Sequence, residues 1–108
     1  MKKSSIYLAA AVVSMALAGV AHADDKAVQS SLKKSGCTTC HSVDKKKVGP
    51  SYKEVSAKYK GNADAAAKLY THLTTGPKVM VDGKEEAHDV MKGSEADIKA
   101  VVTWILSR

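Results

Sequence analysis

The feature that most constrains this chain of 108 residues is the pentapeptide Cys37-Thr38-Thr39-Cys40-His41. It has the form C-x-x-C-H, the spacing at which a c-type haem is covalently attached. Two thiols at this separation can each form a thioether with a vinyl group on the same edge of one porphyrin. The histidine that follows then lies under the ring, where its imidazole can bind the iron. The motif therefore predicts one haem c, bound covalently through two thioethers at Cys37 and Cys40, with His41 as an iron ligand.

A C-x-x-C pair alone also occurs in thioredoxin-like redox sites, in zinc sites and as a structural disulfide. A structural zinc site needs about four ligands, and the chain contains only two cysteines. A thioredoxin-like motif follows a β-strand, and no β-rich run precedes Cys37. The adjacent histidine, an export signal and a helical pattern all favour haem.

The N-terminus has the three parts of a secretory signal peptide. A lysine pair precedes an apolar run over about residues 6–20, and Ala21-His22-Ala23 forms an A-x-A cleavage site. The run is shorter than the ~20 residues that a spanning helix needs, so a membrane anchor is the less favoured interpretation. We expect residues 1–23 to be removed, and residues 24–108 to form one small periplasmic domain without a membrane span.

Basic residues flank the motif. Removal of the lysine pair in the signal peptide leaves 15 of the 17 basic residues against 11 acidic ones, a net charge of +4 before any cofactor. Lys33-Lys34 and Lys45-Lys46-Lys47 lie on either side of the two cysteines. They can surround an exposed haem edge and steer acidic redox partners, or simply keep an exported domain soluble. Nucleic-acid binding is not expected of an exported domain with few free aromatic residues.

Apolar periodicity predicts four helices. The first begins at Asp24-Asp25, turns Val28 and Leu32 toward the core, and ends at Gly36. The second follows the Gly49-Pro50 turn and runs from about Ser51 to Lys60, with Tyr52, Val55 and Tyr59 on one face.

The third and fourth helices are separated by a long polar segment. Asn62 is the expected N-cap of the third, and Gly76-Pro77 ends it. Its stripe consists of Ala66, Leu69, Tyr70 and Leu73. Residues 78–93 show no sustained period and no strand alternation, which predicts a long functional loop. Ser94 and Asp97 then form a capping box before a helix whose buried stripe is Ile98, Val101, Val102 and Ile105.

Together these patterns resemble a small bacterial class I c-type cytochrome. The resemblance is carried by Gly36 with the haem motif, Val48-Gly49-Pro50-Ser51-Tyr52, the helix end from Leu69 to Gly76, and the last helix with Trp104. It covers nearly all of residues 24–108 and implies an all-α fold of about four helices wrapped around one haem. It also implies that Cys37 and Cys40 carry the thioethers, that His41 is the proximal ligand, and that the Pro50 carbonyl accepts the His41 Nδ1–H bond. Tyr52 and Trp104 would pack in the core near the haem.

The sixth iron ligand is where the sequence departs from the family. Relatives usually present a methionine after a proline, and this chain has no Pro-Met pair. The candidates are Met80, His88 and Met91, with His72 a weaker fourth that we expect to be a solvated helix residue. The family ligand precedes the last helix by roughly six to eight residues, the reach needed at ~3.3 Å per residue. His88 lies six residues before the cap Ser94, whereas Met91 lies three and Met80 fourteen residues before it. We therefore expect His88, with Met91 and Met80 as alternatives.

The resulting functional prediction is a periplasmic one-electron carrier that is not an enzyme. It would act as a soluble shuttle or as the cytochrome subunit of a redox complex. We expect it to be a monomer or a part of that complex. Two imidazole ligands predict a lower potential than histidine–methionine ligation. The alternative is a haem-based sensor or gas-binding protein with a labile or absent sixth ligand. A peroxidase-like enzyme would need an open distal site with an acid–base pair, which the sequence does not provide.

Overall fold

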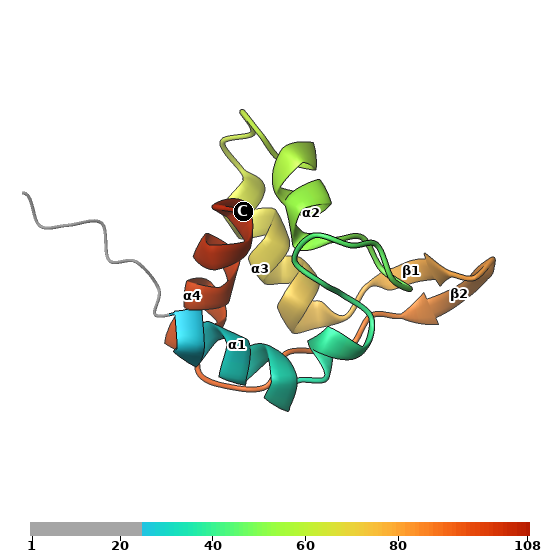
Figure 1. Ribbon diagram of the computed structural model, residues 1–108, viewed down its shortest axis with the longest axis horizontal. Helices are drawn as coiled ribbons and strands as arrows, with labels where there is room; N and C mark the ends of the chain where they lie inside the picture. The colour runs from blue at the N-terminus through green and yellow to red at the C-terminus, as the bar shows by residue number, and fades with distance from the viewer. Residues whose placement is uncertain (1–24) are drawn as a thin grey trace, which may run out of the picture.

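The structure is a computed structural model that describes residues 25–108, so the expected signal peptide at residues 1–23 lies outside the described part. The elements follow in the order α1 (Asp25–Lys34), the short 3₁₀ helix η1 (Cys37–Thr39), α2 (Tyr52–Lys58), α3 (Ala65–Thr75), β1 (Lys78–Val81), β2 (Lys84–Ala87) and α4 (Glu95–Leu106). The four expected helices are confirmed, with a small two-stranded sheet in addition (Figure 1). Within residues 25–108 no helix has the length and apolar character needed to cross a membrane.

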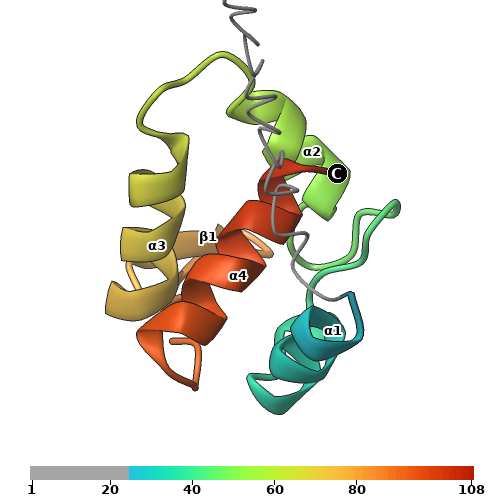
Figure 2. The same cartoon turned by 90° about the vertical axis from the view of Figure 1, so that its left-hand side faces the viewer.

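Helix α4 is the centre of the fold, because it contacts α1, α2 and α3 and lies between α1 and α3 (Figure 2). The predicted capping box is present: the Ser94 hydroxyl accepts from the Asp97 backbone N–H, and the Asp97 carboxylate accepts from that of Ser94. Trp104 is buried and donates its Nε1–H to Asp25 Oδ1 at 2.6 Å, which ties α4 to the start of α1. The predicted stripe of α4 is buried as well: Ile98, Val101, Val102 and Ile105.

Helix α1 buries Val28 and Leu32 as predicted, and the chain turns at Gly36 in the left-handed conformation (φ 74°). The start of α3 differs from the prediction, because Asp64 and not Asn62 occupies the N-cap position. The Asn62 side-chain oxygen instead accepts the Asp64 backbone N–H at 2.9 Å, closing a turn before the helix begins. The buried stripe of α3 accordingly starts at Ala65, whereas Ala66 is exposed.

Residues 78–93 were predicted to form an irregular loop, but residues 78–87 form a β-hairpin and only residues 88–93 are irregular. Strands β1 and β2 pair antiparallel, with Lys78 opposite Ala87 and Val81 opposite Lys84. Asp82 and Gly83 join them with positive φ angles of 50° and 79°, as a two-residue type I′ hairpin turn requires. The hairpin extends away from the helices (Figure 1). The Asp82-Gly83 dipeptide was the sequence signal for this hairpin. The signal was obscured because strand β2 is fully exposed and shows no apolar alternation.

Candidate haem site

The C-x-x-C-H segment forms a tight turn directly after α1. The backbone N–H groups of Cys40 and His41 both donate to the Cys37 carbonyl, at 3.2 and 2.9 Å. Both thiols are half-buried and neither is in a disulfide. Burial, with a smaller contribution from the nearby Asp89 carboxylate, raises the pKa of the Cys37 thiol. A nucleophilic redox cysteine has the opposite shift, so the structure disfavours the thioredoxin-like alternative.

The His41 ring is held on several sides. Its Nδ1–H donates to the Pro50 carbonyl at 2.7 Å, the contact that the resemblance implied. The Tyr52 ring stacks on it, with centroids 5.4 Å apart and planes inclined by 24°. Gly49 lies so close that a Cβ atom there would be 2.5 Å from His41 Cε1. Because Nδ1 is bonded to Pro50, Nε2 is the nitrogen left to bind a metal.

Tyr52 is a buried residue whose hydroxyl has no hydrogen-bond partner within residues 25–108. Its ring stands edge-on to Trp104, with centroids 5.5 Å apart. Burial, and then the nearby Cys37, raises the pKa of the Tyr52 phenol well above its ordinary value. An unpaired buried hydroxyl costs about 1–3 kcal/mol. Such an orphan beside Cys37 and His41 is consistent with a further group binding at this point.

Residues 88–92, here called the distal segment, are attached to two helix ends. The backbone N–H of His88 donates to the Pro77 carbonyl at 2.9 Å, and that of Met91 to the Leu73 carbonyl at 2.8 Å. On the other side, the Lys92 backbone N–H donates to Ser35 Oγ at 3.0 Å. The segment is thereby fixed between the end of α3 and the end of α1, the helix that precedes the motif. The role of Ser35 could not be predicted from the sequence, because a contact across 57 positions leaves no local signal.

The structure places the candidate distal residues very differently. The His88 ring is half-buried, with its centroid 6.1 Å from that of His41. Met80 lies on β1 opposite Glu85 and is 68% exposed, whereas Met91 is 5% exposed and belongs to the hydrophobic core. Of the two candidate histidines, His88 is the one whose ring stands next to that of His41.

The expectation for His72 was wrong, because this residue is half-buried and not simply solvated. Its ring centroid lies 4.4 Å from that of His88. Burial lowers the pKa of His72, and the nearby His88, His41 and Lys58 lower it further. The reason is tertiary: the last turns of α3 pack against the distal segment, which covers a side chain that lies off the apolar stripe.

The centroid separation of the His41 and His88 rings matches the separation that a shared metal atom would require. Metal–imidazole nitrogen bonds are about 2.0 Å long, and the ring centroid lies ~1.1 Å behind the nitrogen, so two imidazoles on opposite sides of one metal have centroids about 6 Å apart. The observed 6.1 Å agrees with this separation. Two reduced thiols, an oriented proximal imidazole and an unpaired buried hydroxyl complete a residue set that fits a covalently attached haem.

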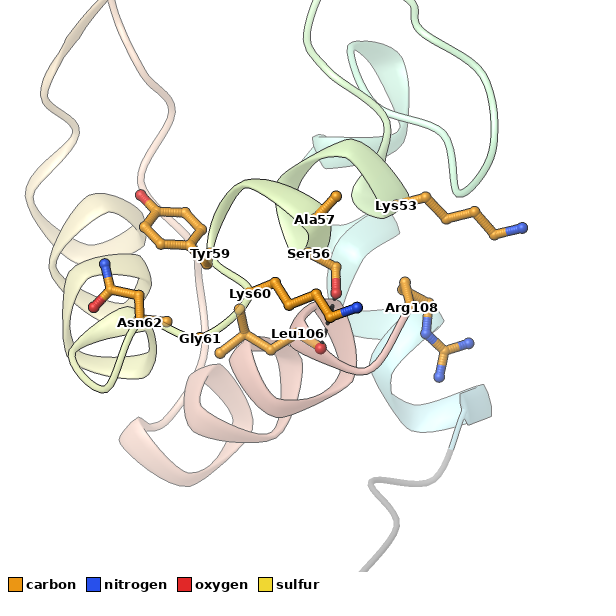
Figure 3. Close-up of a pocket in the computed structure, with 10 residues that line it drawn as sticks. Lys53, Ser56, Ala57, Tyr59, Lys60, Gly61, Asn62, Leu106 and Arg108 are labelled. Carbon is orange, nitrogen blue, oxygen red and sulfur yellow. Dashed lines mark hydrogen bonds between the residues drawn. The ribbon is translucent and has the colours of Figure 1, made fainter.

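A separate hollow of about 560 Å³ lies between α2, the loop that follows it, and the end of α4 (Figure 3). No residue of the C-x-x-C-H motif lines it, and neither does His88. Two of its lining residues are bonded to each other, since the Ser56 hydroxyl donates to the Leu106 carbonyl at 2.9 Å. The lining residues are Lys53, Ser56, Ala57, Tyr59, Lys60, Gly61, Asn62, Ala65, Leu106 and Arg108. This hollow is thus not the haem site.

A helical fold that carries a C-x-x-C-H turn beside a fixed imidazole is that of a small class I c-type cytochrome. The family model described as Cytochrome c matches residues 25–108, and the chain belongs to that family. It is 48% identical over 73 residues to cytochrome c-551 of Allochromatium vinosum, covering 68% of this chain and 77% of the relative.

Two solved structures show the same likeness in three dimensions. The Class 1 cytochrome MtoD from Sideroxydans lithotrophicus ES-1 is 49% identical with a TM-score of 0.76, covering 78% of this chain and 95% of that one. Cytochrome c552 of Nitrosomonas europaea is 34% identical with a TM-score of 0.62, covering 73% and 96%. The chain is accordingly an electron-transfer cytochrome with covalently bound haem c, and an electron carrier rather than an enzyme.

Proposed function

We propose that this protein is a periplasmic one-electron carrier in which Cys37 and Cys40 hold the haem and His41 and His88 bind its iron from opposite sides. The observation that carries the proposal is the 6.1 Å separation of the two imidazole rings. The signal peptide predicted at residues 1–23 supports export, and in bacteria haem is attached to C-x-x-C-H outside the cytoplasm. The bound haem supplies the reversible one-electron change.

The protein's own residues orient the His41 ring and occupy one nitrogen of the His88 ring. The Pro50 carbonyl accepts the Nδ1–H bond of His41 and so fixes the tautomer and orientation of the ring. The Nδ1 atom of His88 lies 2.8 Å from the Asp89 carbonyl, so its Nε2 is also left for the metal. A ligand held as His41 is would change little in position between the two oxidation states, which favours fast electron transfer. Two imidazoles, unlike an imidazole and a thioether, favour the ferric state and lower the potential.

This function is tested by a potentiometric titration of the haem-loaded protein, run beside a methionine-ligated cytochrome c. We expect a single one-electron wave at a lower potential than the methionine-ligated control. The ferric near-infrared spectrum should be low-spin and lack a sulfur-to-iron charge-transfer band. A high-spin ferric spectrum with rapid carbon monoxide binding to the ferrous form would instead establish the sensor alternative.

We further propose that the lysines beside the motif form a docking surface for acidic redox partners. Lys33 and Lys34 occupy the last turn of α1, immediately before the motif. On the other side, the Lys47 ammonium donates to the Thr38 carbonyl at 2.9 Å, which holds positive charge directly against the haem-binding turn. Charge at such a site raises the rate of encounter with anions, and salt reduces the effect.

Electron exchange with hexacyanoferrate, a small anionic reagent, should therefore slow as ionic strength rises, whereas exchange with a cationic cobalt–phenanthroline complex should accelerate. Lys46→Glu should slow the anionic reaction about threefold or more at low ionic strength. Lys60→Glu makes the same charge change at the hollow of Figure 3 and should have a smaller effect. Stopped-flow rates measured over a salt series give the comparison. Equal effects of the two substitutions would show that only net charge matters.

A further inference from the structure

We propose that His72 is a positioning residue that fixes the orientation of the distal imidazole and opposes its release from the iron. The inference rests on the proposed function, in which His88 is the sixth ligand. From the sequence, His72 was only a weak ligand candidate that was expected to be solvated. Its assignment depends on contacts between α3 and the distal segment.

The two histidine rings meet edge to face. Their centroids are 4.4 Å apart and their planes are inclined by 62°. Aromatic rings favour this arrangement at separations of roughly 4.5–7 Å, so His72 and His88 are in close contact. Within residues 25–108, the hydrogen bond of the His88 ring is the one between Nδ1 and the neighbouring Asp89 carbonyl. A bond to the adjacent residue moves with the segment, so contact with a separate element is needed to fix the ring relative to the haem site.

Helix α3 is well suited to provide that contact. His72 precedes the buried Leu73, whose carbonyl accepts the Met91 backbone N–H at 2.8 Å. Four residues after His72, Gly76 lies so close to the distal segment that a Cβ atom there would be 2.6 Å from the His88 carbonyl oxygen. One helix end therefore holds the backbone of the distal segment and the ring of its histidine together. Because α3 also packs on α4, His72 cannot readily move away.

Two measurable quantities depend on this contact. The first is the angle between the two ligand planes, which is 43° in the structure. The g-values of a ferric low-spin haem report this angle, and a ring free to rotate gives broadened or shifted signals. The second is the rate of carbon monoxide binding, which requires the distal imidazole to leave first. An edge-to-face ring contact corresponds to roughly a two- to tenfold change in an equilibrium constant, and ligand release should change by a similar factor.

The test compares His72→Ala with His72→Phe in the haem-loaded protein. Alanine removes the ring, whereas phenylalanine keeps an edge-to-face contact but cannot bind iron or carry charge. Thr71→Ala is the matched control, because it truncates an exposed side chain on the same helix. We expect His72→Ala to broaden or shift the electron paramagnetic resonance signals and to accelerate carbon monoxide binding roughly two- to tenfold. His72→Phe should restore both properties, and Thr71→Ala should match the wild type.

The outcomes separate this inference from the function on which it rests. A wild-type spectrum without a sulfur-to-iron band, combined with His72→Ala behaviour equal to wild type, would overturn the positioning role and leave the bis-histidine carrier intact. A sulfur-to-iron band in the wild-type spectrum would show that His88 is not the iron ligand. The positioning role of His72 would then be refuted together with that assignment. If His72→Ala does not load haem, the His72→Phe variant provides the test. Wild-type resonance signals and carbon monoxide binding rates in His72→Phe would support a packing role, and accelerated carbon monoxide binding would contradict it.

Discussion

Replacing His88 with alanine is expected to convert the ferric haem-loaded protein almost completely from low-spin to high-spin and to allow fast carbon monoxide binding to the ferrous form. The reason is that neither nearby methionine is free to take its place. Met80 lies on the exposed face of the hairpin, opposite Glu85. Met91 is in the core, and its backbone is bonded to Leu73. Absorption and electron paramagnetic resonance spectra of the purified variant measure the change directly.

The opposite substitution gives a stronger form of the same test. His88→Met should produce a sulfur-to-iron charge-transfer band and raise the potential by on the order of 0.1 V, within the ~0.8 V range that axial ligands cover. Met80→Leu and Met91→Leu are the matched controls and should leave the wild-type spectrum unchanged. A wild-type charge-transfer band that disappears in either leucine variant would identify that methionine as the ligand and refute the assignment of His88.

The parts of this structure that could be predicted from sequence depend on neighbouring residues. The stripe of α4 and its Ser94–Asp97 capping box are set by spacings of three and four positions, and both are confirmed. The C-x-x-C-H turn is likewise local. The turn at Gly76 was recognisable because a left-handed residue at a helix end favours glycine.

The missed features depend on tertiary contacts or on weak local signals. Strand β2 reads Lys-Glu-Glu-Ala and is exposed along its length, so no apolar alternation marks it, and only the Asp-Gly turn indicates a hairpin. His72 is off the apolar stripe of α3, and only the packing of the distal segment covers it. The hairpin also explains the fourteen positions between Met80 and Ser94. It projects Met80 outward, and the bond from His88 to Pro77 closes its base.

Gly49→Ala is expected to destabilise the proximal side of the haem site. An alanine Cβ atom would lie 2.5 Å from His41 Cε1, 2.9 Å from Nδ1 and 3.0 Å from Nε2. The His41 ring cannot easily move away, because it is bonded to the Pro50 carbonyl and stacked on Tyr52. The Gly49 backbone is fixed as well, since its N–H donates to the Cys40 carbonyl at 2.8 Å and its carbonyl accepts the Lys47 N–H at 3.1 Å.

Overpacking of this kind costs roughly 1–3 kcal/mol, and here the strain falls on the proposed iron ligand His41. We therefore expect a lower yield of haem-loaded protein, a reduced free energy of unfolding in urea, and altered low-spin signals from the displaced imidazole. Gly61→Ala is the control, because Gly61 has a positive φ of 77° but open space around its Cβ position. That change should cost ~1–2 kcal/mol through backbone strain and leave the haem spectrum unchanged. If Gly49→Ala loads haem with wild-type spectra and stability, close packing against Gly49 does not hold the proximal histidine, and the Pro50 and Tyr52 contacts are sufficient to orient it.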